Sequence, residues 1–217
     1  MKLITIYETL MNHYGDLGWW PADTPFEVMV GAILTQNTAW TNVEKAIARF
    51  DGDLTPARIQ ALSHEELEKI IRPAGFYRQK AAYLKNLTTW FARYAWDTEK
   101  AKDISTEELR RELLAVRGIG NETADSILLY AFDRASFVVD AYTKRLFVRI
   151  PVDAGKKYME IKRFCERNLP EDAVLYNHFH ALIVENAKTH CRKIPRCASC
   201  PLEEMCAKQI ETKKHGR

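Results

Sequence analysis

The chain has 217 residues, of which 47% are hydrophobic, 28% charged and 11% aromatic, and its formal net charge is +3. This composition excludes a disordered chain and supports a sizeable core, in one domain or in two small lobes. The weak net charge excludes a general basic field, so a nucleic-acid site must be a local patch. The start of the chain lacks a secretory signal and no apolar run could cross a membrane, so we expect a soluble cytoplasmic protein.

Helical periodicity runs along most of the chain. Residues 3–14 predict an amphipathic helix, and a loop with paired tryptophans follows at residues 15–21. Pro25 begins a helix that is apolar nearly all round and therefore buried, and polar residues 35–38 interrupt it. Further helices are expected over about residues 40–50, 63–71, 77–94, 156–167 and 172–188. No strand signal and no internal repeat is apparent, so the sequence predicts an all-α fold.

The central stretch, residues 113–149, predicts two helices joined by a tight turn and then a third helix. Ser105 and Glu108 have the spacing of a capping box at the start of the first helix. Gly118 and Gly120 break that helix and bring bare N–H groups to the surface at the start of the next one. Such a turn can bind a phosphate, and it would contact a nucleic-acid backbone without reading sequence. An ordinary helical hairpin is the alternative.

Asp140 follows the apolar run Phe137–Val139 directly, just before the pattern of the third helix. An acidic residue at this place can be an N-cap. It can also be a catalytic carboxylate, because a charge acts strongly in partly dry surroundings. The two roles are compatible.

These segments, VRGIGNETADSILLYA followed by VVDAY, resemble the helix-hairpin-helix and Gly/Pro-Asp motifs of the endonuclease III superfamily of DNA glycosylases. The resemblance extends from about Leu17 to Cys206. It implies a two-lobed fold, with a helical-barrel domain at residues 22–133 that contains the hairpin (about 106–132). The second domain would combine residues 1–21 and 134–217, with a cleft between the two domains.

The resemblance also implies an activity and a partner. The hairpin would grip double-stranded DNA that contains a damaged base, and Asp140 would drive cleavage of the N-glycosidic bond. We expect a monomer in a prokaryotic cytoplasm, bound to the DNA of the nucleoid. The expected contacts to the DNA backbone are Arg117, Gly118, Gly120, Asn121, Thr123, Lys144, Arg192 and Lys193.

Four of the five cysteines fall in one short segment, at Cys191, Cys197, Cys200 and Cys206, whereas Cys165 stands alone in a helical pattern and is expected to be buried. A reducing compartment disfavours disulfides, so clustered thiolates indicate a metal or iron–sulfur site. Zinc is the default from chemistry alone. The resemblance instead implies a 4Fe–4S cluster, although the family spacing has one more residue between the first two cysteines.

The lysine of the bifunctional family members is missing. In those enzymes it lies two residues past the second hairpin glycine, where this chain has Glu122. The resemblance therefore implies a monofunctional enzyme, in which Asp140 activates water or stabilises an oxocarbenium-like sugar. Lys144, one turn after Asp140, could be a substitute amine, a phosphate contact or a salt-bridge partner of Asp140.

The segments GWWP, LTQNTAW, RPAGFYRQK and FHALIVENAK resemble one branch of the superfamily, the 3-methyladenine DNA glycosylases of the Helicobacter type. That branch implies an alkylated adenine stacked between Trp19 and Trp40, and aromatic faces attract a cationic alkylated purine. The alternative is that these tryptophans belong to the core or the surface. The expected base pocket comprises Trp19, Trp20, Pro21, Trp40, Glu122 and Lys188.

Three features depart from that branch. It lacks an iron–sulfur loop, it has a lysine at the position of Leu182, and it has a smaller aromatic residue at the position of Trp40. The slot for the base can therefore be narrower here. Within the polar break, we expect Asn37, or its neighbour Gln36, to be the side chain that fills the DNA stack when a base is flipped out.

Three functions remain open from the sequence. The first is a monofunctional glycosylase in base excision repair that removes 3-methyladenine and other alkylated purines. The second is a glycosylase for oxidised pyrimidines or mismatched bases, with or without AP lyase activity. The third is a non-catalytic iron–sulfur module that binds DNA, against which the retained Asp140 argues.

Overall fold

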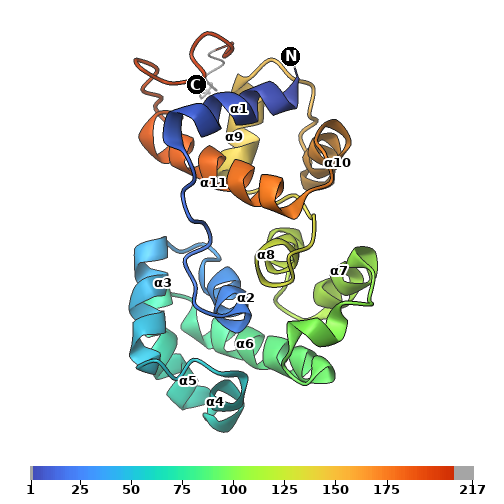
Figure 1. Cartoon of the computed structure of the whole chain (residues 1–217). Coiled ribbons are helices and arrows are strands. Elements are labelled where there is room, and N and C mark those ends of the chain that lie inside the picture. Colours follow the sequence, from blue (N-terminus) through green and yellow to red (C-terminus); the bar gives the residue numbers. More distant parts are fainter. Residues whose placement is uncertain (1, 208–217) are drawn as a thin grey trace, which may run out of the picture. The chain divides into compact units, whose positions relative to one another are not determined.

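The computed structural model describes residues 2–207, and in this part of the chain every regular element is a helix (Figure 1). The predicted all-α class is therefore confirmed. No helix in the described part is long and apolar enough to cross a membrane. The α-helices are α1 (Leu3–Tyr14), α2 (Pro25–Leu34), α3 (Trp40–Ile47), α4 (Pro56–Ala61), α5 (His64–Ile71), α6 (Tyr77–Phe91), α7 (Thr106–Ala115), α8 (Asn121–Ala131), α9 (Ala141–Arg149), α10 (Tyr158–Asn168) and α11 (Ala173–Thr189). Short 3-10 helices cover Ala48–Phe50, Arg72–Ala74, Ala92–Tyr94 and Thr98–Ala101.

The chain divides into two compact units. The first unit comprises the described parts of Met1–Trp19 and Phe137–Arg217 and contains α1, α9, α10 and α11. Within it, α11 packs along both α1 and α9 (Figure 1). The second unit is Trp20–Ser136 and contains α2 to α8, of which α2 packs against α6 and α8.

Helix α2 lies at the centre of the core of the second unit. It begins with Pro25 at its first position, and the side chain of Thr24 accepts a hydrogen bond from the N–H of Glu27 (3.1 Å). Eight of its ten residues are buried. Burial on all sides agrees with its apolar sequence, and each fully buried large side chain contributes about 1.5–3 kcal/mol to stability.

Two predicted helix starts differ in their capping. At α5, Ser63 and Glu66 form both hydrogen bonds of a capping box. At α7, Ser105 accepts from the N–H of Glu108 (3.2 Å), but the carboxylate of Glu108 accepts from Arg111 (2.9 Å) instead of returning to Ser105. The capping box predicted at Ser105 is therefore wrong in its second half, because a cation one turn later takes the carboxylate.

Helix α4 has no counterpart in the sequence analysis. Thr55 caps it by accepting from the N–H of Arg58 (3.1 Å), and Pro56 occupies its first position. A threonine followed by proline is a standard helix start. The helix is only six residues long, and Ile59 is its one residue described as buried, so it has too little periodicity to be recognised.

Candidate active site

Asp140 is the N-cap of α9, as the sequence predicts. One carboxylate oxygen, Oδ1, accepts from the backbone N–H of Thr143 (2.7 Å). The other, Oδ2, lies 3.6 Å from Nε2 of His180, which comes from α11. The side chain of Asp140 is 14% exposed and that of His180 is 5% exposed. The carboxylate therefore has limited access to solvent, and both of its oxygens have a donor group beside them.

Two opposing effects act on the pKa of Asp140. Burial is the largest, and it raises the pKa because a carboxylate is costly to desolvate. The imidazole of His180, 3.6 Å away, and the N–H of Thr143 lower it by more. The pKa of Asp140 therefore lies below its ordinary value, and the group is an anion at neutral pH. A buried anion in a cleavage site can stabilise a developing positive charge.

The predicted hairpin is present between α7 and α8, and one of its glycines is strictly required. Gly118 has φ +102°, and a Cβ atom there would lie 2.2 Å from the ring of Tyr83 on α6. Gly120 has φ −97° and is the N-cap of α8, without a side-chain cap. A Cβ at Gly120 would meet nothing within 4 Å. The N-terminus of α8 is thus open, which is the geometry that an anion needs.

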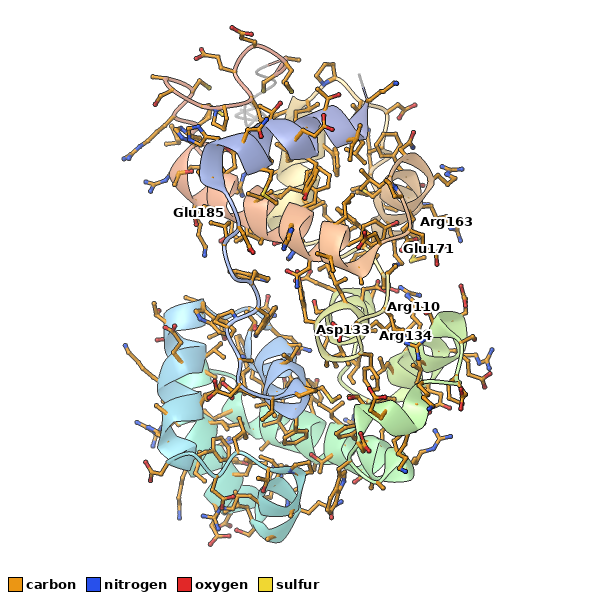
Figure 2. The ribbon with its side chains drawn as sticks, in the orientation of Figure 1. Arg110, Asp133, Arg134, Arg163, Glu171 and Glu185 are labelled. Carbon is orange, nitrogen blue, oxygen red and sulfur yellow. The ribbon has the colours of Figure 1, made fainter. Side chains whose placement is uncertain are left out.

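A buried ion pair joins the two helices of the hairpin. Arg110 on α7 donates through Nε to Asp125 on α8 (2.8 Å) and through Nη2 to the side chain of Asn121 (2.7 Å). Asp125 is 0% exposed and also accepts from Ser136 (2.7 Å). Figure 2 shows Arg110 beside α7 and α8. The predicted backbone contact Asn121 is therefore also a structural residue.

The polar break after α2 packs against the hairpin. Gln36 donates through Nε2 to the carbonyl of Gly118 (3.0 Å) and to the hydroxyl of Thr123 (3.0 Å). Thr123 is buried, so its side chain faces the interior and not the surface where a phosphate would lie. Asn37 is exposed and has φ +52°. Of the two predicted intercalating residues, Asn37 is exposed, whereas Gln36 is partly buried and its amide donates to the hairpin.

A groove of about 1070 Å³ lies between α6 and the hairpin. Its lining includes four arginines, Arg78, Arg93, Arg111 and Arg117, and the single carboxylate of Glu112. Arg93 is paired with that carboxylate (3.1 Å). The groove therefore has an excess of positive charge next to the glycine turn. Because the net charge of the chain is low, a nucleic-acid site would have to be a local basic patch of this kind.

The predicted pocket tryptophans have different surroundings. In the second unit, the ring of Trp20 meets Trp40 edge-on, with centroids 5.2 Å apart, and packs over Gly31. The indole N–H of Trp40 donates to Glu44 (3.0 Å). Trp20 therefore supports Trp40 from the core side, and both rings are partly buried.

In the first unit, Trp19 is half-buried and Nζ of Lys188 lies 5.5 Å from its ring centroid. This is a cation–π contact, so the structure brings together two of the predicted pocket residues. Pro21 is exposed, and Glu122 is an exposed acid in the first turn of α8, where it complements the helix dipole.

The other predicted backbone contacts lie in the first unit. Nζ of Lys144 lies 5.8 Å from the ring centroid of Tyr158, and within residues 2–207 it forms no ion pair with Asp140. Arg192 is exposed and donates to the carbonyl of Lys188 (2.6 Å), and Lys193 is exposed. Lys144 is thus directed to an aromatic ring on α10.

The four clustered cysteines line one small cavity, together with Arg149 and His190. Arg149 is buried and donates to Sγ of Cys191 (3.2 Å) and to the carbonyl of Arg192 (2.7 Å). Among residues 2–207, no three acidic, cysteine or histidine side chains lie close enough to hold one metal ion. Cys165 is buried, as predicted.

Residues 30–171 match the HhH-GPD superfamily of base excision DNA repair proteins. The chain belongs to this superfamily. It is 52% identical, over 93% of its length and 94% of the relative's, to a candidate DNA repair glycosylase of Methanocaldococcus jannaschii. It is 28% identical to endonuclease III of Sulfolobus acidocaldarius, over 88% and 85% of the two chains.

A solved structure of this superfamily has a similar fold. It is the 3-methyladenine DNA glycosylase of Helicobacter pylori bound to 1,N6-ethenoadenine, with a TM-score of 0.74 and 28% identity over 87% of this chain and 98% of that one. These findings confirm the resemblance inferred from the motifs. The protein is an HhH-GPD DNA glycosylase of base excision repair.

Sequence reasoning missed two residues of this HhH-GPD site. His180 lies in an apolar helical stripe, where a lone histidine ordinarily belongs to the core. Tyr83 lies within a long helix, and no motif in the sequence marks it. Both act through contacts between elements that are far apart in the sequence. The only sequence signal was an ionisable residue on the buried face of α11.

Proposed function

We propose that this glycosylase is monofunctional and removes alkylated purines, 3-methyladenine first among them, from double-stranded DNA. The observation that supports this most directly is the buried, ionised Asp140 at the start of α9. In the reaction, the bond between C1′ and the base nitrogen breaks and its electron pair leaves with the base. Water then adds to C1′ and gives up a proton. Asp140 stabilises the positive charge on the sugar between these events and accepts that proton directly or through water.

Trp19 and Trp40 are the proposed stacking surfaces for the flipped base. The Helicobacter glycosylase, which binds an ethenoadenine, supports a purine substrate. A cationic alkylpurine is a good leaving group and is attracted to aromatic faces, which suits a site with no second obvious acid. Asn37, which is exposed, is the proposed side chain that enters the stack. Gly120 and Arg117 are the proposed contacts to the DNA backbone.

The absence of a lysine at Glu122 supports hydrolysis without strand cleavage. A lyase needs an amine that attacks C1′ to form a Schiff base. Glu122 cannot supply it, and the amine of Lys144 lies over an aromatic ring. Borohydride should therefore trap no covalent adduct between the protein and lesion-containing DNA, and strands should break only after alkali.

We also propose that Cys191, Cys197, Cys200 and Cys206 hold a 4Fe–4S cluster. Thiolates on a single zinc ion converge at about 2.3 Å from it, whereas those on a cluster bind separate irons and lie further apart. The cavity that all four cysteines line supports one shared metal group, and the resemblance to the endonuclease III superfamily favours the cluster over zinc. When bound, the cluster would tie the cysteine loop together next to α9. The exposed Arg192 and Lys193 on this loop are proposed as further phosphate contacts.

The proposal is tested by base release from duplex DNA treated with a methylating agent, using the intact purified protein. Free 3-methyladenine, with nicks only after alkali, is expected. Asp140→Asn keeps an N-cap side chain, so it should fold normally and lose base release about a hundredfold or more. No release of any alkylpurine, combined with release of oxidised pyrimidines or mismatched thymine, would overturn the substrate but keep Asp140. Full activity of Asp140→Asn would overturn the mechanism.

A further inference from the structure

His180 is the ionisable side chain that faces Asp140 most closely. Its Nε2 lies 3.6 Å from Oδ2 of Asp140, while Oδ1 is already committed to the N–H of Thr143 at 2.7 Å. His180 is 4% exposed, so it lies behind the carboxylate and has no surface for a substrate. Any effect on the reaction must therefore pass through Asp140.

We propose that His180 is a positioning residue for the glycosylase reaction, which keeps Asp140 ionised and holds its Oδ2 in place despite burial. The inference deepens the proposed function, since it concerns the same carboxylate. A buried carboxylate without a partner has a raised pKa, so it is already protonated at pH values where an ordinary aspartate is still charged. Once protonated, it cannot stabilise the sugar cation. With the imidazole behind it, the carboxylate keeps its charge and its orientation.

The other ionisable groups on the neighbouring elements do not replace His180. Lys144, on α9 itself, lies 5.8 Å from the ring centroid of Tyr158. The hydroxyl of Tyr158, on α10, lies 3.5 Å from the N–H of Val139 and accepts from it. Arg145 on α9 donates to the carbonyl of Cys191 (2.6 Å). On α11, Nε2 of His178 lies 3.7 Å from Oδ1 of Asp16, so His178 pairs with a different carboxylate.

The sign of the effect follows from the two opposing influences on Asp140. Burial raises its pKa, whereas His180 lowers it. The imidazole of His180 therefore opposes protonation of Asp140 in the range where protonation would stop the reaction. Replacing His180 with glutamine removes one of the two groups that lower this pKa and leaves only Thr143 to oppose the effect of burial. The pKa of Asp140 should then rise, and base release should be lost at a higher pH than in the wild type.

The experiment compares His180→Gln with His178→Gln in the intact protein. The second variant removes an imidazole from the same helix, whose side chain is 26% exposed and faces a different aspartate, so it is a matched control. Single-turnover base release is measured from pH 4.5 to 8 on whichever lesion the wild type releases. In His180→Gln the acid limb of the rate should move up by about one pH unit or more, with little change in rate at pH 8. In His178→Gln it should not move.

A second measurement does not depend on activity. The carboxyl carbon of Asp140 is followed by NMR in protein labelled at aspartate, with Asp140→Asn used for assignment. Its titration midpoint should lie below the ordinary value in the wild type and rise in His180→Gln. An unchanged midpoint and an unchanged acid limb would overturn the inference, even if the enzyme releases alkylpurines as proposed.

The two proposals can fail separately. If the protein releases no base from any lesion, the proposed function fails, while the carboxyl titration still decides the role of His180. If neither His180→Gln nor His180→Asn folds, the wild-type titration decides, because a midpoint of Asp140 at or above its ordinary value would contradict the inference.

Discussion

The ring of Tyr83 lies where a side chain at position 118 would have to be. A Cβ on Gly118 would come within 2.2 Å of two atoms of that ring, and the backbone there has φ +102°. Helix α6 thus supports the hairpin from behind and leaves no room for any residue but glycine. Gly120, two residues later, has neither constraint. Glycine is therefore required at position 118 by the fold, whereas at position 120 the fold alone does not require it.

Substitution of the two glycines should separate folding from DNA binding. Gly118→Ala forces a strained φ and displaces Tyr83, so it should lower the free energy of unfolding by about 2 kcal/mol or more. Gly120→Ala should cost at most about 1 kcal/mol, because its backbone suits alanine and its Cβ meets open space. Urea denaturation of both variants measures this difference.

Duplex binding distinguishes the role of Gly120. A methyl group at the open N-terminus of α8 would keep a phosphate away from the N–H groups, so Gly120→Ala should weaken binding about tenfold or more. The dependence of affinity on salt should become shallower, since one phosphate contact is lost. Wild-type affinity in Gly120→Ala would show that the hairpin is only a structural turn.

The sequence predicted the features that depend on local pattern. Helical periodicity located ten of the eleven α-helices within residues 2–207, and the acid after Phe137–Val139 identified an N-cap. These features repeat every three or four residues or mark a boundary within one turn, so neighbouring residues carry the information. Helix α4 was not predicted because its six residues are too few for the apolar pattern to repeat.

The features that the sequence did not predict depend on pairing between distant elements. Gln36 was the alternative to Asn37 as the intercalating side chain, and the sequence did not show that its amide donates to Gly118 and Thr123, more than eighty residues later. His180 meets Asp140 across two helices in the same way. A single sequence does not show which helical faces pack together, so these partners can be identified only from the three-dimensional structure.

Lys80 provides a prediction about stability and pH. It is 2% exposed, and its ammonium donates to the carbonyls of Leu34 and Ala74 and to the hydroxyl of Thr38, each at 2.8 Å. It thereby ties the break after α2 to the turn before α6. Lys80→Met would remove the ammonium donor from the carbonyl of Leu34 and from the oxygens of Thr38 and Ala74, so we expect a loss of about 2–4 kcal/mol, measured by urea denaturation at pH 7.

The pH dependence of that loss is the check on its cause. Burial lowers the pKa of Lys80 from 10.5 to about 8. Between pH 8 and 10 the unfolded chain therefore binds more protons at this residue than the folded protein does, and the contribution of Lys80 becomes more favourable as pH rises. The free energy of unfolding of the wild type relative to Lys80→Met should increase across this range. A constant difference would show that burial does not weaken the charged form.

The ion pair inside the hairpin gives a matched comparison of a buried and an exposed arginine. Arg110 pairs with Asp125, which is 0% exposed, whereas Arg111, its neighbour on α7, pairs with Glu108 on the surface (2.9 Å). Arg110→Ala would leave a buried carboxylate without its cation and should cost about 3–5 kcal/mol. Arg111→Ala should cost less than about 1 kcal/mol. Equal thermal shifts in the two variants would contradict the assigned role of Arg110.

The cysteine loop gives a prediction about composition. If Cys191, Cys197, Cys200 and Cys206 bind a 4Fe–4S cluster, protein purified without oxygen should contain about four irons and four sulfides per chain and should absorb visible light. Cys197→Ser should lose most of the iron, whereas Cys165→Ser, at a buried position outside the loop, should keep it. One zinc per chain and no iron would assign the loop to a single ion.

If the loop binds the proposed cluster, Arg149 should influence how firmly the cluster is held. Its guanidinium donates to Sγ of Cys191 and to two carbonyls of the loop, those of Arg192 (2.7 Å) and Lys193 (3.2 Å). Arg149→Lys keeps the charge but loses the fork that makes these bonds together. Iron should therefore be released faster to a chelator from Arg149→Lys than from Arg167→Lys, in which an exposed arginine of α10 is changed. Equal release rates would show that charge alone, without the fork, holds the loop.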